Sequence, residues 1–435
     1  MARFSQVRSR NYNPNALASR VLKRVLEGQS LESALQRYRG TEFRAEIFNV
    51  CYQCMRHYFS LAERLQSMLN RPRDRLDLEV WCVLLAGACQ LEYSRTPPHA
   101  VVSNAVDATR KVGKSSASSL VNAVLRNYKT DSELKSIEAK YELPQWLLDS
   151  IESHYPDVAA ELANALMSRA PLTLRVNSHR LSLEDFCSLL DEAGIEHFLP
   201  ATPNSVTLDE PRSMSSIPGY DEGYFAVQDL SSQLAVPLLE PNSSDRILDA
   251  CSAPGVKTAQ IVDLYPDNCV VSVDVKPQCS TWNMLPKPQL RPRLETVQGD
   301  LRTTGWWDNV PYQRILLDAP CSGTGTIRRH PDLKVVRQHS DVLELKELQG
   351  NLLASVWGTL ANEGLLVYST CSFLPEENDE TIERFVSTQS DAFIDRFCLP
   401  YGASTNFGWQ ILPTRAGGDG FYYARLRKSE EASCT

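Results

Sequence analysis

The sequence lacks the features by which secreted and membrane-spanning proteins are recognised. No apolar run in its 435 residues approaches the roughly 18 to 20 residues that a membrane helix needs, and the strongest stretch, 80–88, suits a core helix. The chain opens without the apolar core of a signal peptide, and its 12 cysteines follow no repeating framework. We therefore expect a protein of the reducing cytoplasm without membrane contact, whose cysteines are mostly small core residues.

Other scarcities narrow the function. The glycines do not follow the Gly-x-Gly-x-x-Gly spacing, so the dinucleotide fingerprint is absent. The seven histidines offer few ways to activate a nucleophilic cysteine. A net charge of -8 argues against indiscriminate polyanion binding but leaves room for a local basic face. What is present is an ordinary globular composition, 43% hydrophobic and 23% charged, in a chain long enough for several domains.

The first 140 or so residues predict an all-α bundle, because apolar residues recur at helical spacing in 17–26, 47–58 and 120–128. Positive charge gathers at the start of this segment: Arg8, Arg10, Arg20, Lys23 and Arg24. Such a cluster is typical either of a solvated helix face or of a surface that binds RNA. The residues alone leave both readings open.

Residues from about 141 to 240 predict a small α+β module. Three short runs are typical of strands: Leu172–Val176, Val206–Leu208 and Tyr224–Val227. An amphipathic helix is expected over 182–193, with Ser182 near its N-terminal cap.

From about 241 to 430, short β-branched runs alternate with helical patterns. Five runs are expected to be strands: Arg246–Asp249, Val270–Asp274, Leu294–Asp300, Arg314–Asp318 and Leu365–Tyr368. This alternation predicts an α/β domain with a doubly wound, mostly parallel sheet. Ligands bind such sheets beyond the carboxyl ends of the strands, so residues at those ends are the candidates for a site.

The first three strand ends indicate a nucleoside cofactor. Small residues and a glycine follow the first strand in Asp249–Thr258 (Asp-Ala-Cys-Ser-Ala-Pro-Gly-Val-Lys-Thr), so the backbone there can approach a ligand. The second strand ends in Asp274, a position from which a carboxylate can accept hydrogen bonds from ribose hydroxyls. The third runs into Gly299 and Asp300. Successive acid-bearing strand ends favour a nucleoside over a dinucleotide.

Two cysteines and an aspartate stand at the next two strand ends. The segment Asp318–Gly325 (Asp-Ala-Pro-Cys-Ser-Gly-Thr-Gly) ends the fourth strand, and Ser369–Ser372 (Ser-Thr-Cys-Ser) ends the fifth. One buried cysteine at such an end would be ordinary packing. Two of them on the ligand side of one sheet, Cys321 and Cys371, indicate chemistry.

These cysteine motifs, together with Pro375–Asn378 (Pro-Glu-Glu-Asn), resemble the RNA cytosine-5 methyltransferase family. The resemblance covers essentially the whole chain, including Gln228-Asp229 and Gly418–Tyr422, and is greatest to members that act on small-subunit (16S) ribosomal RNA. It implies a NusB-like helical RNA-binding domain (1–140), an α+β RNA-contacting module (141–240) and a Rossmann-like methyltransferase domain (241–430). The cofactor it implies is S-adenosylmethionine, the partner is ribosomal RNA, and we expect a monomer.

The resemblance also implies roles for the site residues. Cys371 attacks carbon 6 of the cytosine and makes carbon 5 nucleophilic, and Cys321 serves product release. By residue chemistry alone, either cysteine could be the nucleophile. Asp318 is expected to bind or protonate the Watson–Crick edge of the base. No metal is expected, and the residues expected to hold the cofactor are Cys251, Ser252, Ala253, Pro254, Gly255, Val256, Lys257, Asp274, Asp300 and Asp318.

Alternatives remain at this point. The cofactor loop carries Val256 where the family usually has a second glycine, so a noncatalytic NusB-like RNA-binding assembly factor is the second hypothesis. A cysteine hydrolase ranks below it, because His330 alone lies near a cysteine loop. Arg328 and Arg329, which follow the Cys321 loop, are either phosphate contacts or ordinary exposed arginines.

Overall fold

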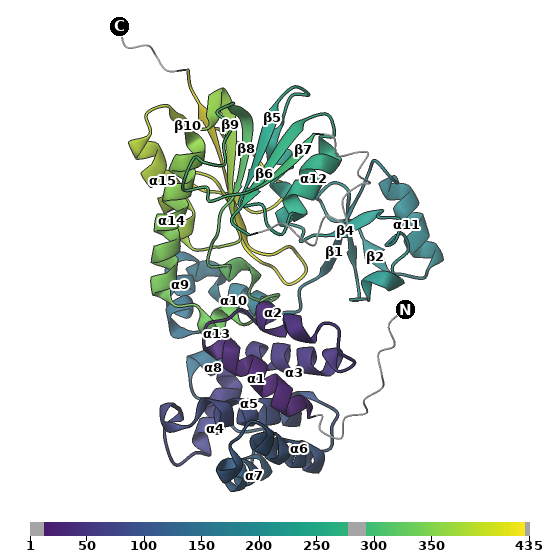
Figure 1. Cartoon of the computed structure of the whole chain (residues 1–435), viewed down its shortest axis with the longest axis vertical. Coiled ribbons are helices and arrows are strands. Elements are labelled where there is room, and N and C mark those ends of the chain that lie inside the picture. Colours follow the sequence, from purple (N-terminus) through teal and green to yellow (C-terminus); the bar gives the residue numbers. More distant parts are fainter. Residues whose placement is uncertain (1–12, 277–292, 431–435) are drawn as a thin grey trace. The chain divides into compact units, whose positions relative to one another are not determined.

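The structure is a computed structural model that describes residues 13–276 and 293–430 (Figure 1), so Arg8 and Arg10 lie outside the described residues. The chain divides into two compact units: residues up to Pro156 together with His330–Arg337, and Asp157–Arg329 together with the sequence after Arg337. No helix in the described ranges has the length and apolar character needed to cross a bilayer. The domain boundaries expected near 140 and 240 stay predictions.

The first unit is helical, as predicted. Its long helix α5 is apolar on all sides, and its residues from Val80 to Gln90 are buried, so it forms the centre of the core. Four cysteines of this unit, Cys51, Cys54, Cys82 and Cys89, are buried in the same core. The helices of this part of the chain are α1 (Pro14–Leu26), α2 (Leu31–Leu35), α3 (Arg44–Arg56), α4 (Tyr58–Ser67), α5 (Leu78–Tyr93), α6 (Pro98–Lys111), α7 (Ser118–Arg126), α8 (Ile137–Tyr141) and α9 (Gln145–His154).

A segment from much later in the sequence completes this unit. It contains the short helix α13 (Leu333–Val336). Asp332 accepts a hydrogen bond from the N–H of Leu31 at 2.9 Å, at the start of α2. The buried Lys334 ammonium donates to the carbonyl of Arg56 at 2.6 Å, at the end of α3. Both contacts satisfy helix-end groups that lack a partner within their own helix.

The second unit begins with α10 (Ala159–Met167) and the predicted α+β module. Its sheet has the strand order β2-β3-β1-β4, and all neighbouring strands are antiparallel. Ser182 caps α11 (Leu183–Glu192) by accepting from the N–H of Asp185 at 3.1 Å. The strands are β1 (Leu172–Val176), β2 (His197–Phe198), β3 (Ser205–Leu208) and β4 (Phe225–Val227), so the three expected strands are present and β2 was not expected.

The larger sheet has the order β11-β12-β13-β9-β8-β5-β6-β7, with β10 paired to β13. Its strands are β5 (Arg246–Ala250), β6 (Cys269–Asp274), β7 (Leu294–Gln298), β8 (Tyr312–Asp318), β9 (Leu360–Thr370), β10 (Ala392–Ile394), β11 (Ala403–Ser404), β12 (Trp409–Ile411) and β13 (Phe421–Lys428). The five expected strands, β5 to β9, pair in parallel, and the later strands pair antiparallel. Alternating apolar runs do not reveal strand direction, so the antiparallel part was missed.

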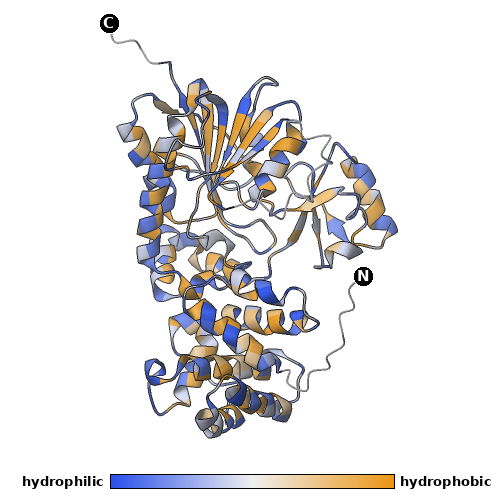
Figure 2. Cartoon of the chain, viewed as in Figure 1, coloured by the Kyte–Doolittle hydropathy of each residue, from blue (hydrophilic) through white to orange (hydrophobic). Residues whose placement is uncertain are grey.

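Helices cover both faces of this sheet (Figure 1). Helix α12 (Val256–Leu264) packs on one face, and α14 (His339–Trp357) and α15 (Asp379–Thr388) pack on the other. Consecutive residues of β5 lie on opposite faces: Ile247 is in the core with α12, and Leu248 is in the core with α14 and α15. This is expected for a strand that is buried on both sides. Figure 2 shows the hydrophobic colouring concentrated along these central strands. The parallel core therefore presents its strand ends along one edge, where the predicted site residues stand.

Candidate active site

A cavity of about 550 Å³ opens at the carboxyl ends of the parallel strands. Its volume lies within the range of small-molecule sites in proteins. The predicted site residues that line it are Cys251, Ala253, Asp274, Asp300, Asp318, Cys321 and Cys371. The other predicted cofactor residues, Ser252, Pro254, Gly255, Val256 and Lys257, form the turn into α12 next to it.

Cys321 and Cys371 lie at the ends of the adjacent strands β8 and β9. Their sulfur atoms are 3.3 Å apart, and the backbone N–H of Cys371 also approaches the Cys321 sulfur at 3.3 Å. Both are free thiols and half-buried. The hydrogen bond to Cys371 and burial together hold the pKa of Cys321 well above its ordinary value. Cys321 therefore keeps its proton and can direct it at the Cys371 sulfur.

Asp318 is held at the wall of the same cavity by two donors. The Lys257 ammonium donates to its Oδ2 at 2.6 Å, and the Ser369 hydroxyl donates to its Oδ1 at 2.8 Å. Lys257 is buried, which alone would lower its pKa, but the adjacent Asp318 carboxylate outweighs burial and raises it. The Lys257 ammonium also lies 5.4 Å from the centre of the Phe421 ring. A charged lysine thus stands directly behind the carboxylate that faces the cavity.

The predicted cofactor acids differ in their surroundings. Asp274 ends β6 and accepts the backbone N–H groups of Ala253 at 2.9 Å and Lys276 at 2.8 Å. It thereby connects the turn after β5 to the end of β6. Asp300 follows β7 and is clamped by the Arg302 guanidinium at 2.7 Å, which lowers the pKa of the Asp300 carboxyl to about 2. Both carboxylates still line the cavity.

The turn into α12 forms in spite of the valine in the glycine-rich loop. Gly255 has φ +99°, a left-handed conformation that favours glycine, whereas Val256 begins the helix with ordinary helical geometry. Glycine is therefore required at 255 and not at 256. The departure from the family pattern at Val256 leaves this turn intact.

Glu377 is a functional candidate that the sequence analysis did not assign. Its buried carboxylate accepts the N–H of Ser322 at 2.7 Å and the Gln349 amide at 3.1 Å, and burial raises its pKa. The next residue, Asn378, donates to the carbonyl of Ser372 at 3.1 Å. These two residues therefore hold the loops that carry Cys321 and Cys371. Their position directly after the second cysteine motif was the available signal.

Both alternatives considered for Arg328, a phosphate contact and an ordinary exposed arginine, are wrong, because Arg328 is buried in the interior. Its guanidinium donates to Asp419 at 2.6 Å and to the carbonyls of Thr414 and Gly417. Arg329 is half-buried and reaches Asp229 at 2.8 Å as well as Asp419. The Gln-Asp and Gly-Asp-Gly motifs thus supply the carboxylates of one ion network that joins the α+β module to the large sheet.

The geometry of a cysteine hydrolase is not found within the described ranges. His330 is exposed and belongs to the first unit, and no histidine there hydrogen-bonds to Cys321 or Cys371. The same ranges contain no cluster of three or more His, Cys, Asp or Glu side chains suited to a metal ion.

Family models match most of the chain in three consecutive segments. Residues 236–427 match the model described as 16S rRNA methyltransferase RsmB/F, residues 12–130 match the NusB family, and residues 143–215 match the RsmF/B-like, ferredoxin-like domain. Their order is the order of the helical, α+β and Rossmann-like parts predicted from the sequence.

Curated relatives match over nearly the full length. The chain is 36% identical over 430 residues to ribosomal RNA small subunit methyltransferase B of Klebsiella pneumoniae subsp. pneumoniae, covering 96% of this chain and 99% of the relative. It is 37% identical over 434 residues to the protein of the same name from Pseudomonas syringae pv. tomato, covering 96% and 97%.

Solved structures share the fold. The crystal structure of PH0851 matches with a TM-score of 0.80 and 21% identity over 96% of this chain and 99% of that one. A methyltransferase homolog protein from Pyrococcus horikoshii matches with a TM-score of 0.57 and 26% identity over 67% and 97%. NSun6 from the same organism, solved with SFG, matches with a TM-score of 0.59 and 19% identity over 66% and 99%.

Proposed function

Since the chain belongs to the ribosomal RNA small subunit methyltransferase B family, we propose that it moves a methyl group from S-adenosylmethionine to carbon 5 of a cytosine in 16S ribosomal RNA. The observation that carries this proposal is the pair of cysteine sulfurs 3.3 Å apart, which share one cavity with Asp318. Two thiols and a carboxylate are the groups that covalent activation of a pyrimidine requires. All cysteines described by the structure are unpaired, as suits a cytoplasmic enzyme.

The cavity fits the proposed cofactor in size and in charge. Asp274, Gly299 and Asp300 line this cavity together. Glycine at 299 leaves room beside Trp306, because the Cβ of any other residue there would lie 2.7 Å from the Trp306 Cβ. We expect Asp274 to bind the ribose hydroxyls and Asp300 the adenine edge. S-adenosylmethionine supplies a methyl group on a positively charged sulfur, and the carboxylates that line this cavity favour such a cation.

In the proposed addition step, the Cys371 thiolate forms a bond to carbon 6 of the cytosine. The electron pair of the carbon 5–carbon 6 double bond then shifts toward carbon 5, which becomes able to take up the methyl group. N3 of the ring takes up a proton from water, and the Asp318 carboxylate accepts a hydrogen bond from this N3–H, which stabilises the charge that the thiolate introduces. The Lys257 ammonium behind Asp318 keeps this carboxyl group in place.

In the proposed release step, the proton on carbon 5 passes to water, the double bond between carbon 5 and carbon 6 reforms, and the bond between carbon 6 and the Cys371 sulfur breaks. The Cys321 thiol stabilises the departing Cys371 thiolate by donating a hydrogen bond to it. We assign this release to Cys321, whose sulfur is adjacent to that of Cys371. Attack on carbon 6 is blocked in a stacked helix, so the target base must be unpaired or flipped out. The NusB-like and ferredoxin-like segments are then the parts that hold the surrounding RNA.

The two cysteine variants test these roles, because they interrupt different steps. Cys371→Ala removes the attacking sulfur, so neither methyl transfer nor a covalent adduct should form. Cys321→Ala should allow addition and methyl transfer but slow release, and a protein–RNA complex that survives denaturation should accumulate on a gel. This band should vanish in the double variant. If the two phenotypes are exchanged, Cys321 is the nucleophile.

The competing hypothesis is a noncatalytic RNA-binding assembly factor. It predicts no binding of S-adenosylmethionine, whereas the enzyme hypothesis predicts a titration that calorimetry can follow. Bisulfite mapping of 16S ribosomal RNA from cells with and without the gene provides the second test. A cytosine that loses protection only in the deletion strain would identify the substrate, and an unchanged map would refute the proposed reaction.

A further inference from the structure

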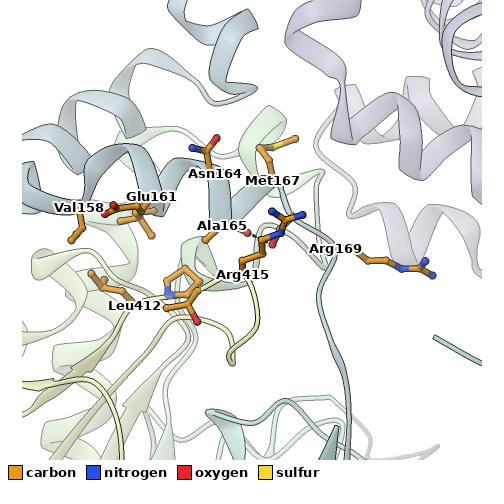
Figure 3. A pocket seen from close by; sticks show the side chains of 12 residues that line it. Val158, Glu161, Asn164, Ala165, Met167, Arg169, Leu412 and Arg415 are labelled. Atoms are coloured by element: carbon orange, nitrogen blue, oxygen red, sulfur yellow. Dashed lines mark hydrogen bonds between the residues drawn. The ribbon is translucent and has the colours of Figure 1, made fainter. Parts of the chain in front are cut away.

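A second cavity, of about 1000 Å³, lies in the second unit (Figure 3) and shares no lining residue with the cavity of the cysteine pair. One wall is helix α10, which belongs to the segment that matches the ferredoxin-like domain. The other wall is the segment from Leu412 to Arg415, between strands β12 and β13 of the large sheet. We call this cavity the α10 groove. Ligand sites often form where two folded segments meet in this way.

The α10 groove carries two arginines whose charge is not neutralised within the described residues. Arg169 and Arg415 are both exposed, and neither makes a hydrogen bond or ion pair with another described residue. Other arginines of this unit are paired with carboxylates, among them Arg175, Arg246, Arg314, Arg328, Arg329 and Arg425. In a protein of net charge -8, two free guanidinium groups at one cavity favour an anionic ligand.

The floor of the groove is apolar. Leu162, Ala165 and Pro413 are buried there, while the exposed Glu161 and Asn164 add an acceptor and an amide at its edge. Figure 3 shows the Arg415 side chain beside α10, close to Ala165, with Arg169 at one end. Guanidinium groups bind RNA phosphates, and an apolar surface can contact the face of an unpaired base, so these elements suit a nucleotide of single-stranded RNA.

The groove wall is fixed to the catalytic segment by a buried contact. The carbonyl of Thr414 accepts a hydrogen bond from Arg328 at 2.8 Å, and Arg328 is also paired with Asp419. Arg328 follows the Cys321 loop directly in the chain. RNA bound in the groove would therefore be held by the same rigid framework that carries Cys321.

We infer that the α10 groove binds an unpaired nucleotide of the substrate RNA that flanks the target cytosine. The base lies against the apolar floor, and Arg169 and Arg415 bind the phosphates on its two sides. This inference rests on the proposed function for the identity of the RNA but concerns a separate set of residues. The groove contributes affinity and no chemistry.

The test compares three variants with the wild-type protein. Arg169→Gln/Arg415→Gln removes both charges, and Asn164→Trp fills the groove from an exposed position without a charge change. The control is Arg384→Gln, because Arg384 on α15 is also exposed and lies outside the groove, the cysteine cavity and the segments proposed to hold RNA. A fluorescein-labelled single-stranded oligoribonucleotide of 16S sequence is titrated at several salt concentrations, and methyl transfer is measured on the same RNA.

The double arginine variant should bind the RNA at least tenfold more weakly, with a salt slope reduced by about 1.4, since each phosphate contact to a single strand contributes about 0.7. Its KM for RNA should rise while kcat and the affinity for S-adenosylmethionine stay unchanged. Asn164→Trp should weaken binding without changing the slope, and Arg384→Gln should resemble wild type.

Wild-type RNA affinity in both groove variants would overturn the inference and leave the proposed reaction standing. Failure of the wild-type protein to methylate any 16S fragment would instead refute the proposed function. A loss of kcat at saturating RNA in the arginine variant would also overturn the inference, because it would place these residues in the chemistry.

Discussion

The second unit contains two ion pairs of equal length whose side chains differ in their exposure to the cavity. Lys257 and Asp318 meet at 2.6 Å, as do Arg328 and Asp419. The Asp318 side chain is still 32% exposed at the cavity, whereas Arg328 and Asp419 are 0% and 1% exposed. Lys257, Asp318 and Asp419 belong to motifs that carry the family resemblance, and Arg328 follows the Cys321 loop, yet among these four residues only Asp318 lines the cavity.

The difference lies in how completely each charge is satisfied. Arg328 and Arg329 surround the Asp419 carboxylate, and the remaining Arg328 donors reach backbone carbonyls. Such a network fixes two chain segments and has no capacity left. Asp318 has one ammonium and one hydroxyl donor and keeps an open side toward the cavity. A charged group that still faces the cavity can take part in chemistry. A charged group whose hydrogen-bonding capacity is fully used can only join chain segments.

The largest effect is expected from Asp318→Asn, which should remove the proposed contribution of Asp318 to the chemical step. The neutral amide cannot stabilise the proton at N3 of the cytosine as a carboxylate does, so kcat should fall by about 10² to 10⁴, the usual contribution of a positioned acid or base. Thermal stability should also fall, because the buried Lys257 ammonium loses its carboxylate partner, so kcat is measured at a temperature where the variant is folded. Single-turnover methyl transfer at saturating RNA and cofactor measures the effect.

Asp395→Asn is the matched control for this variant. Like Asp318, Asp395 is paired with a buried cation, here Arg425 at 2.8 Å, but it does not line the cavity. Its replacement should leave kcat unchanged. Equal losses in both variants would mean that Asp318 acts only through the stability of the unit.

Arg328→Met should produce the opposite result. It leaves the buried Asp419 with Arg329 as its remaining ion-pair partner and removes two bonds to backbone carbonyls, so the unfolding free energy of the second unit should fall by about 3 kcal/mol or more. At a temperature where the variant is folded, S-adenosylmethionine affinity should be close to wild type. Denaturant unfolding followed by tryptophan fluorescence, together with calorimetry, would show both. Normal stability would contradict the structural role.

The sequence could predict the strand-end residues because their placement follows from the topology of a parallel sheet. Cys321, Cys371 and Asp318 each end a predicted strand, and the structure brings them to one cavity. The exposure of Arg328 could not be predicted in the same way. An arginine after a glycine-rich loop is most often exposed, and its partner Asp419 lies 91 residues away in sequence. Only the tertiary structure reveals that pairing.

The position of the segment 330–337 also depends on long-range contacts. It lies between the Cys321 loop and α14 in sequence, but its buried Lys334 and Asp332 pair with helix ends of the first unit. Nothing in its periodicity indicates this, because a short helix that packs on another part of the chain has no distinctive pattern. The sequence alone therefore carries no signal that residues 330–337 pack with the first unit, as the contacts show.

The smallest effect is expected from Asp249, a buried acid of the same region. No cation of the described residues lies within hydrogen-bond range of its carboxyl group. Burial raises the pKa of Asp249 to about 7, while a hydrogen bond from Thr258 acts in the opposite direction and the nearby Asp318 adds to the rise. The ordinary value is about 4. The folded protein thus prefers the protonated form, so the stabilising contribution is complete below about pH 4 and is lost as the pH rises through 7.

The loss should amount to no more than about 1.4 kcal/mol per pH unit between those values. Asp249→Asn keeps the shape of the side chain and removes the titration. Hydrogen exchange of the β5 amides, corrected for the intrinsic pH dependence of exchange, should show that wild type gains stability over the variant as the pH falls from 8 to 5. A difference between the two proteins that stays constant over this range would show that Asp249 is charged throughout. Burial without a nearby cation would then not favour the protonated form of Asp249.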